Sequence, residues 1–330
     1  RMLAVGRGGA AAAMAAMTIM SGMRGSRGGP ERTLCMKGGD GADESSPQDF
    51  ARHQATGMKM PPVVYGTAWK KERTEELVLK AVLEGFRGID TACQPKHYFE
   101  PGVGRALLRL QQQHNIPRSQ LWVQTKFTPV RGQDPNNIPY DPNAPLEEQV
   151  VQSMTRSLAN LHTDYVDALV LHSPLPTHEM TMRVWRAMEN LCEEGKARSL
   201  GISNCYSLSA LKDLHSSSRV KPTILQNRFY RDSNFDKELR EFCTQHGITY
   251  QSFWTLTANP DILSSRAVKS LSNKYNKTPE QVLFAFVQAI GITPLTGTSS
   301  TGHMREDLDV AQNGALQLEE GEVEDIKKML

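Results

Sequence analysis

The chain lacks any long apolar run. Of its 330 residues, 39% are hydrophobic and 22% are charged. The longest uninterrupted apolar stretches end within about eight residues, well short of the roughly 18 that a membrane-spanning helix needs. We therefore expect a soluble folded part with no membrane partner, long enough for one large domain or two small ones.

The chain also has little excess of positive over negative charge. The formal net charge is only +2, and no long block of lysine and arginine occurs. A sequence-independent nucleic-acid surface needs such a basic patch, so we expect no nucleic-acid partner. This composition favours an enzyme that acts on small metabolites.

Cysteine is rare, and its spacing matches no common metal motif. The five cysteines include no C-x-x-C pair and have no histidine at zinc-finger spacing. An odd, scattered set of this kind is typical of a reducing compartment. We therefore predict an intracellular protein with neither a disulfide nor a metal site.

Residues 1–57 differ in composition from the rest of the chain. Glycine, alanine and methionine dominate, several arginines occur, and no acidic residue precedes Glu31. This composition is typical of a transit peptide, which would direct the protein to a plastid or mitochondrion. The alternative is a disordered tail on a cytoplasmic protein, because the segment lacks clear amphipathic periodicity.

From Met60 onward, short β-branched apolar runs alternate with longer helical stretches, which predicts one domain over residues 58–330 with a parallel sheet. The expected strands are 63–65, 86–90, 121–126, 166–171, 199–202, 223–226, 248–253 and 292–295. Eight strand and helix units over about 270 residues match the α/β class of a (β/α)8 TIM barrel. A doubly wound sheet would normally carry G-x-G-x-x-G after its first strand, and none occurs.

Capping residues indicate where several helices begin. Thr74 is expected to cap a helix that runs to residue 84, and Ser207 to cap residues 208–214. Thr278 is followed by proline and, three residues on, by glutamine, which predicts a capping box. A last helix is expected over residues 319–329.

Polar side chains stand at the carboxyl ends of four expected strands: Asp90, Lys126, His172 and the pair Ser203-Asn204. Enzymes with this fold carry their reactive groups at these ends. Taken singly, each has a structural alternative: Asp90 as a helix cap, Lys126 as a solvated strand end, and His172 as a satisfied buried histidine.

Together with their neighbours, these residues resemble the aldo-keto reductase family from about residue 60 to the end. The matching motifs are Gly-Thr-Ala-Trp (66–69), Gly-Ile-Asp-Thr-Ala (88–92), Thr-Lys (125–126), Asp-Tyr-Val-Asp (164–167), Leu-His (171–172), Gly-Lys-Ala-Arg-Ser-Leu-Gly-Ile-Ser-Asn (195–204), Gln-Asn (226–227) and Gly-Thr-Ser (297–299). The resemblance implies a reductase of aldehydes or ketones.

In that family Asp, Tyr, Lys and His converge on the carbonyl oxygen, which needs a proton as it becomes an alkoxide. Asp90, Lys126 and His172 occupy three of these places. The tyrosine departs from the usual Asp-Thr-Ala-x-x-Tyr-x-Asn-Glu, because Pro95 stands at its position and the segment is about two residues longer. We take Tyr98 as the acid and expect Lys126 to lower its pKa; the alternative is an aromatic that packs on the barrel rim.

The resemblance also implies NADPH as cofactor, with NADH as an alternative, since His303 stands where the usual arginine for the 2′-phosphate would be. Phe253 occupies the place of the aromatic that stacks on the nicotinamide, with Trp254 as a second candidate. The expected cofactor-binding residues are Gly66, Thr67, Ala68, Ser203, Asn204, Gln226, Phe253, Trp254, Leu256, Thr298, Ser299, His303, Arg305, Glu306 and Asp307. Arg305 has a solvated helix position as its alternative role.

The substrate is less specified than the cofactor. A long polar loop after residue 127 is expected to shape the mouth of the pocket. The sequence ends at Leu330, directly after the expected helix 319–329, and lacks the long C-terminal loop that closes the pocket in many members of the family that it resembles. We therefore predict an open, permissive pocket for a small-molecule carbonyl substrate. We expect a monomer. The alternatives are a non-catalytic nicotinamide-binding regulatory or assembly subunit on the same fold, and a barrel hydrolase or isomerase, which would have no use for Ser203, Asn204 and Gln226.

Overall fold

The computed structural model describes residues 59–330 except 313. The predicted transit-like segment, 1–57, lies outside the described residues. Among the helices of the described part, none is both long and apolar enough to cross a membrane. Four cysteines fall in this part, and all four are buried free thiols.

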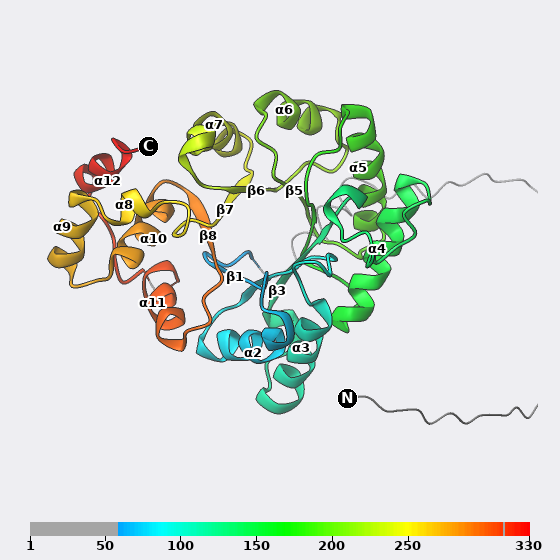
Figure 1. The fold of residues 1–330 in the computed structure, drawn as a ribbon, viewed down its shortest axis with the longest axis horizontal. Helices are drawn as coiled ribbons and strands as arrows, with labels where there is room; N and C mark the ends of the chain where they lie inside the picture. Colours follow the sequence, from blue (N-terminus) through cyan, green and yellow to red (C-terminus); the bar gives the residue numbers. More distant parts are fainter. Residues whose placement is uncertain (1–58, 313) are drawn as a thin grey trace, which may run out of the picture. The chain divides into compact units, whose positions relative to one another are not determined.

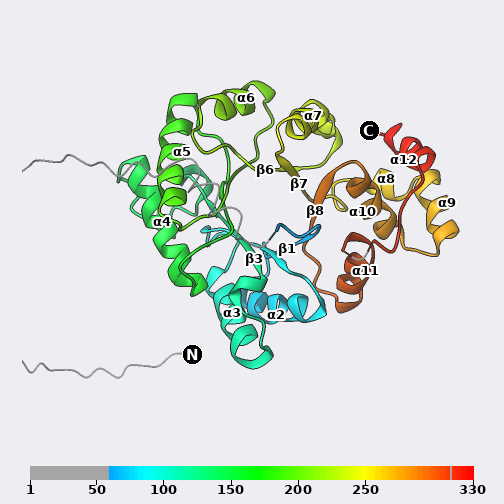
Figure 2. The same cartoon turned by 180° about the vertical axis from the view of Figure 1, so that it is seen from behind.

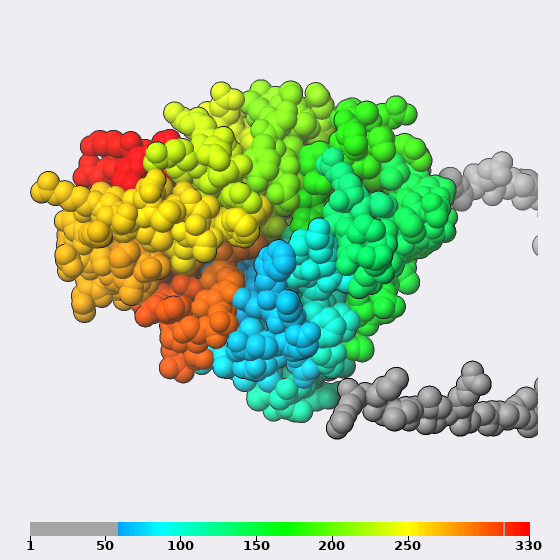
Figure 3. Space-filling model, viewed as in Figure 1, coloured from blue at the N-terminus to red at the C-terminus, as the bar shows by residue number. Residues whose placement is uncertain are grey.

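The described chain forms a closed barrel of eight parallel strands in sequence order, with β1 hydrogen-bonded to β8. The strands are β1 (Val64–Gly66), β2 (Gly88–Asp90), β3 (Trp122–Phe127), β4 (Ala168–Leu171), β5 (Leu200–Ser203), β6 (Ile224–Arg228), β7 (Thr249–Phe253) and β8 (Ile292–Thr296). Figure 1 shows the helices around them, and Figure 3 shows the blue start of the described chain beside the orange segment of β8 and α11. The predicted (β/α)8 barrel is confirmed.

The helices form an outer layer, seen from the other side in Figure 2. The α-helices are α2 (Thr74–Glu84), α3 (Glu100–His114), α4 (Leu146–Leu161), α5 (His178–Glu193), α6 (Leu208–Ser217), α7 (Lys237–Gln245), α8 (Pro260–Leu263), α9 (Arg266–Tyr275), α10 (Pro279–Ala289), α11 (Thr301–Ala311) and α12 (Glu320–Lys327). Three helices separate β7 from β8, and α12 packs against α9. The connection from β7 to β8 is therefore extended by two helices beyond the single helix of a simple βα unit.

Two strands start later than expected, because the residues before them make other backbone contacts. Phe86 was expected in β2, but its backbone N–H donates to the Ala81 carbonyl at 3.0 Å and completes the end of α2. Val166 was expected in β4, but it forms only an isolated bridge with Ala197 ahead of the continuous ladder. The β2 and β4 ladders therefore begin two residues later than predicted.

Two of the three predicted helix caps are confirmed. Ser207 accepts from the Ala210 N–H at 3.2 Å, and Thr278 forms the full capping box. The Thr74 cap is wrong, because a 3₁₀ turn precedes α2 and makes Thr74 its first residue. The Thr74 hydroxyl instead donates to the Lys71 carbonyl at 2.7 Å.

Candidate active site

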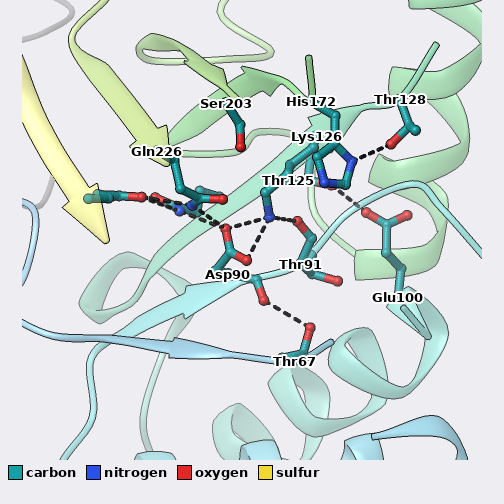
Figure 4. A network of polar contacts seen from close by, with 12 residues as sticks. Thr67, Asp90, Thr91, Glu100, Thr125, Lys126, Thr128, His172, Ser203 and Gln226 are labelled. Carbon is teal, nitrogen blue, oxygen red and sulfur yellow. Dashed lines mark hydrogen bonds and ion pairs between the residues drawn. The ribbon is translucent and has the colours of Figure 1, made fainter. Parts of the chain in front are cut away.

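A buried ion pair lies inside the barrel at the carboxyl ends of β2 and β3. Lys126 Nζ lies 2.6 Å from both carboxylate oxygens of Asp90 and donates to the Thr91 carbonyl at 2.9 Å. The two residues are only 1% and 2% exposed. Figure 4 shows Lys126 directed at Asp90 from the neighbouring strand. Neither the helix-cap role of Asp90 nor the solvated role of Lys126 fits this burial.

Two buried glutamines from β3 and β6 bond to Asp90, and a third from β7 bonds to both of them. Gln124 Nε2 donates to Asp90 Oδ1 at 2.7 Å, and Gln226 Nε2 donates to the same oxygen at 3.0 Å. Both amides also bond to Gln251 Oε1, at 2.8 and 2.9 Å. Since buried polar groups need partners, this network satisfies Asp90 Oδ1 in the orientation in which the carboxylate contacts Lys126.

Tyr98 lies in the segment between β2 and α3, partly exposed above the ion pair. Its backbone N–H donates to the Gln94 carbonyl at 3.0 Å, so the longer segment closes into a turn. Lys126 Nζ lies 5.0 Å from the centre of the Tyr98 ring, and the His172 ring lies 6.0 Å from it, edge on. The structure thus brings Asp90, Tyr98, Lys126 and His172 together.

The expected effect of Lys126 on Tyr98 is wrong for this site. Burial, followed by the negative charge of Asp90, raises the pKa of Tyr98 well above its ordinary value. Burial also lowers the pKa of Lys126, although Asp90 opposes that change. Loss of solvation of the charged form is therefore the main cause of the raised pKa of Tyr98, and the Asp90 carboxylate adds to it. Tyr98 is protonated at neutral pH, which is the state a proton donor requires.

His172 follows β4 and is held on both sides. Its backbone N–H donates to the Phe127 carbonyl at 2.9 Å, and its own carbonyl accepts from Asn204 Nδ2 at 2.9 Å. Its ring Nδ1 lies 2.6 Å from Thr128 Oγ1. Burial, and then the Lys126 charge, lower the pKa of His172 well below its ordinary value. The imidazole is therefore neutral at physiological pH.

Ser203 and Gln226 are register partners on β5 and β6, and they offer one free donor and one free acceptor among the described residues. Ser203 is 1% exposed, and its hydroxyl has no acceptor among the described residues. Gln226 uses its Nε2 for Asp90 and Gln251, and no described residue donates to its Oε1. Asn204 was predicted alongside them, and its backbone φ is +52°. Its side-chain amide donates to the His172 carbonyl and to Ser203 Oγ.

The aromatic candidates after β7 differ in their surroundings. Trp254 is 51% exposed, and the Arg228 guanidinium lies 4.2 Å from the centre of its ring. Phe253 is partly buried at the end of β7, and Leu256 packs against the core. One ring face of Trp254 is therefore covered by a cation, whereas Phe253 carries no such neighbour among the described contacts.

The end of β1 contacts both Asp90 and the loop after β8. Thr67 donates to the Asp90 carbonyl from its backbone N–H at 3.0 Å and from its hydroxyl at 2.8 Å. A Cβ at Gly66 would lie 3.4 Å from the Thr296 carbonyl oxygen, so this strand end approaches β8 closely. Ala68 follows in the same loop, and Lys70 Nζ donates to the Gly297 carbonyl.

The loop after β8 leads into α11, which Ser300 caps by accepting from the His303 N–H at 3.4 Å. The Thr298 hydroxyl accepts from the Ser300 N–H at 3.1 Å, while Ser299 and His303 are exposed. Arg305 turns toward α2, where it contacts both carboxylate oxygens of Glu84 at 2.7 and 3.1 Å. Arg305 and Glu306 line a surface hollow beside Glu84.

Asp307 is a buried carboxyl in α11 whose charge opposes folding. Burial raises its pKa to about 6, although Thr296 donates to it at 2.7 Å. Its folded pKa exceeds its unfolded pKa of about 4, so stability should fall as pH rises from about 4 to 6 and stay reduced above. We expect Asp307→Asn to raise the free energy of unfolding at pH 8 by about 3 kcal/mol.

Urea unfolding at pH 4 and pH 8 measures this effect. The gain in Asp307→Asn should be present at pH 8 and nearly absent at pH 4. Asp309→Asn, in the same helix but partly exposed and paired with Lys277, is the matched control and should show no such gain. An equal effect of Asp307→Asn at both pH values would contradict the burial of a charge as its cause.

Four residues of the site were not predicted from the sequence: Gln124, Gln251, Thr128 and Lys70. Each glutamine lies in the middle of a predicted strand, on the face that it shares with every second residue, and a polar side chain at such a position is a signal for a polar group inside the barrel. Thr128 directly follows Phe127, the last residue of β3, and Lys70 follows the Gly-Thr-Ala-Trp motif. No local pattern assigned these two residues a partner, because both partners lie in other βα loops.

The fold and the site define a (β/α)8 barrel protein with a buried polar centre at the carboxyl ends of its strands. The family model of the aldo/keto reductase family matches residues 57–330. The chain therefore belongs to the aldo/keto reductase family, and it is an oxidoreductase of that family.

Individual relatives agree with this assignment. The chain is 30% identical to an NAD/NADP-dependent indole-3-acetaldehyde reductase of Schizosaccharomyces pombe, over 77% of this chain and 87% of that protein. It is 28% identical to a methylglyoxal reductase of Yersinia pestis, over 77% and 84%. Among solved structures, an aldo/keto reductase of Brucella melitensis matches with a TM-score of 0.67 and 26% identity, over 82% and 95%.

Proposed function

We propose that the protein reduces aldehydes or ketones to alcohols with NADPH as the preferred reductant and NADH as a weaker one. The observation that carries this proposal is the convergence of Tyr98, His172 and the Asp90–Lys126 pair at one point of the barrel mouth. A relative named for NAD/NADP dependence and aldehyde reduction supports the same reaction class.

In this mechanism Tyr98 is the general acid. As the carbonyl carbon gains a hydride, its oxygen takes up the π electrons, and the Tyr98 O–H bond breaks to protonate that oxygen. The Lys126 ammonium, whose Nζ lies 5.0 Å from the centre of the Tyr98 ring, would stabilise the negative charge of the phenolate left behind. Neutral His172 donates a hydrogen bond to the same oxygen and orients it. Such fixed donors are most effective where water is largely excluded.

The residues present fit a nicotinamide. A carboxamide has one donor group and one acceptor atom, and Ser203 Oγ and Gln226 Oε1 offer the complementary pair. Phe253 offers a ring face at the end of β7 for stacking. When bound there, a reduced nicotinamide supplies the hydride. The loop after β8, with Thr298, Ser299 and the start of α11, would hold phosphate through backbone amides and hydroxyls.

The test is to follow NADPH and NADH oxidation with a panel of aldehydes and ketones of different size and polarity. Turnover of several members is expected, because the proposed pocket is open and permissive. Binding of nucleotide without turnover of any carbonyl would instead favour a non-catalytic nicotinamide-binding subunit. Strict preference for one small polar substrate would contradict the permissive pocket.

The choice between NADPH and NADH is proposed to depend on Arg305, whose charge is offset by Glu84. The Arg305 contact holds the pKa of Glu84 below its usual range. We expect Glu84→Gln to free Arg305 and to raise the preference for NADPH over NADH by about two- to fivefold, the range of an exposed ionic contact. Fluorescence titration with both nucleotides measures the ratio of dissociation constants. The double variant Glu84→Gln/Arg305→Ala is the control, and an equal gain there would show that Arg305 does not contact the 2′-phosphate.

A further inference from the structure

We propose that Thr128 is a positioning residue that fixes the tautomer of His172, so that the imidazole presents an Nε2–H donor to the carbonyl oxygen of the substrate. This inference rests on the proposed function, since it concerns the group that orients the carbonyl. Thr128 lies outside the four catalytic candidates, and its single task is to keep His172 Nδ1 unprotonated.

The contact between the two side chains is short and specific. Thr128 Oγ1 lies 2.6 Å from His172 Nδ1, a distance typical of a strong hydrogen bond. Figure 4 shows Thr128 facing one ring nitrogen while the other nitrogen lies on the side of Lys126. Because a neutral imidazole carries one proton, the direction of this bond decides which nitrogen is the donor in the site.

Burial decides the direction of the bond. Thr128 is 3% exposed, and among the described residues its hydroxyl has no hydrogen-bond partner other than His172. If the ring donated from Nδ1, the hydroxyl proton would be buried without an acceptor, which costs about 1–3 kcal/mol. Donation from Thr128 to Nδ1 avoids that cost. The single imidazole proton then resides on Nε2.

Thr128 is itself held in place by the loop after β3. Its carbonyl accepts from Tyr140 Oη at 2.6 Å and from Gln133 Nε2 at 3.1 Å. Its methyl group packs against Gly132, where an added Cβ would lie 2.8 Å from Cγ2. The Gly132 carbonyl in turn accepts from Gln94 Nε2 at 2.6 Å. The Thr128 hydroxyl and the His172 imidazole are therefore both held in place by their own loops.

The direct test is ¹⁵N NMR of the full-length protein labelled only at histidine. The nitrogen shifts distinguish a protonated from an unprotonated ring nitrogen, and His172→Gln assigns the signals of this ring. We expect Nε2 protonated and Nδ1 unprotonated in the parent. A parent with the proton on Nδ1 would overturn the proposal, whether or not the protein turns over any carbonyl.

Two variants link the tautomer to the reaction. Thr128→Val keeps the shape but removes the hydroxyl, whereas Thr128→Ser keeps the hydroxyl. Loss of one oxyanion donor costs about 10²- to 10³-fold in kcat, so loss of tautomer control alone should cost about tenfold in Thr128→Val. Thr128→Ser should retain parent kinetics and parent nitrogen shifts, and NADPH affinity should be unchanged in both.

The outcomes separate this inference from the proposed function. Unchanged shifts and unchanged kinetics in Thr128→Val would overturn the positioning role, and thermal melting verifies that both variants are folded. Equal losses in the valine and serine variants, with parent shifts in both, would also overturn it, because packing would then be the cause. A parent without activity on any carbonyl would overturn the proposed function, while the nitrogen shifts would still decide the tautomer.

Discussion

Replacing Tyr98 with phenylalanine should lower kcat by about 10²- to 10⁴-fold, the range that a positioned general acid contributes. The variant keeps the ring beside Lys126 and His172 and removes only the hydroxyl. Nucleotide affinity should be unchanged, because the residues proposed to hold the nicotinamide lie on β5, β6 and β7. Single-turnover kinetics with NADPH and fluorescence titration measure the two quantities separately.

The matched control for this variant is Tyr275→Phe. Tyr275 is a tyrosine in α9 whose hydroxyl donates to Glu322 at 2.7 Å, in the outer layer. Its loss should leave kcat unchanged. Undiminished turnover in Tyr98→Phe would remove Tyr98 from the mechanism and return it to an aromatic that packs on the barrel rim.

Neutralising either member of the Asp90–Lys126 pair should destabilise the fold by about 3–5 kcal/mol and abolish turnover. In Asp90→Asn, an ammonium that is 1% exposed keeps only neutral partners such as the Thr91 carbonyl. In Lys126→Met, the carboxylate keeps the glutamine amides but loses its counter-charge. Each single variant therefore buries one uncompensated charge.

The double variant Asp90→Asn/Lys126→Met should be less destabilised than the sum of the two single variants, because it buries no charge. Urea unfolding followed by circular dichroism gives all three free energies of unfolding. Glu147→Gln is the control, since its partner Arg183 forms an exposed pair of the kind that contributes little. Additive effects of the two buried substitutions would show that the pair is not energetically coupled.

Periodicity predicted the barrel because each strand and helix follows from its own residues. All eight expected strands occur, and the caps at Ser207 and Thr278 form as predicted. Where local prediction was wrong, a neighbouring segment competed for the same backbone. Thr74 was displaced from its cap by a preceding 3₁₀ turn, and Phe86 was retained by the end of α2.

The position of Tyr98 depended more on the tertiary structure than that of any other predicted catalytic residue. The sequence identified a tyrosine near the expected position, but the longer segment left its placement open. The fold of that segment decided it, because the turn at Gln94 places Tyr98 beside Lys126 and leaves Pro95 exposed. The expected lowering of its pKa was wrong, since burial, followed by the negative charge of Asp90, raises the pKa of Tyr98.

The sequence by itself determined the barrel, its family and the strand ends that carry Asp90, Lys126 and His172. These depend on periodicity and on motifs within a few residues of one another. Only the tertiary structure decided that Gln226 meets Asp90 across 136 positions, that Thr128 meets His172 and that Arg305 turns to Glu84. Such pairs are set by the register in which the barrel closes, and no local run of residues specifies it.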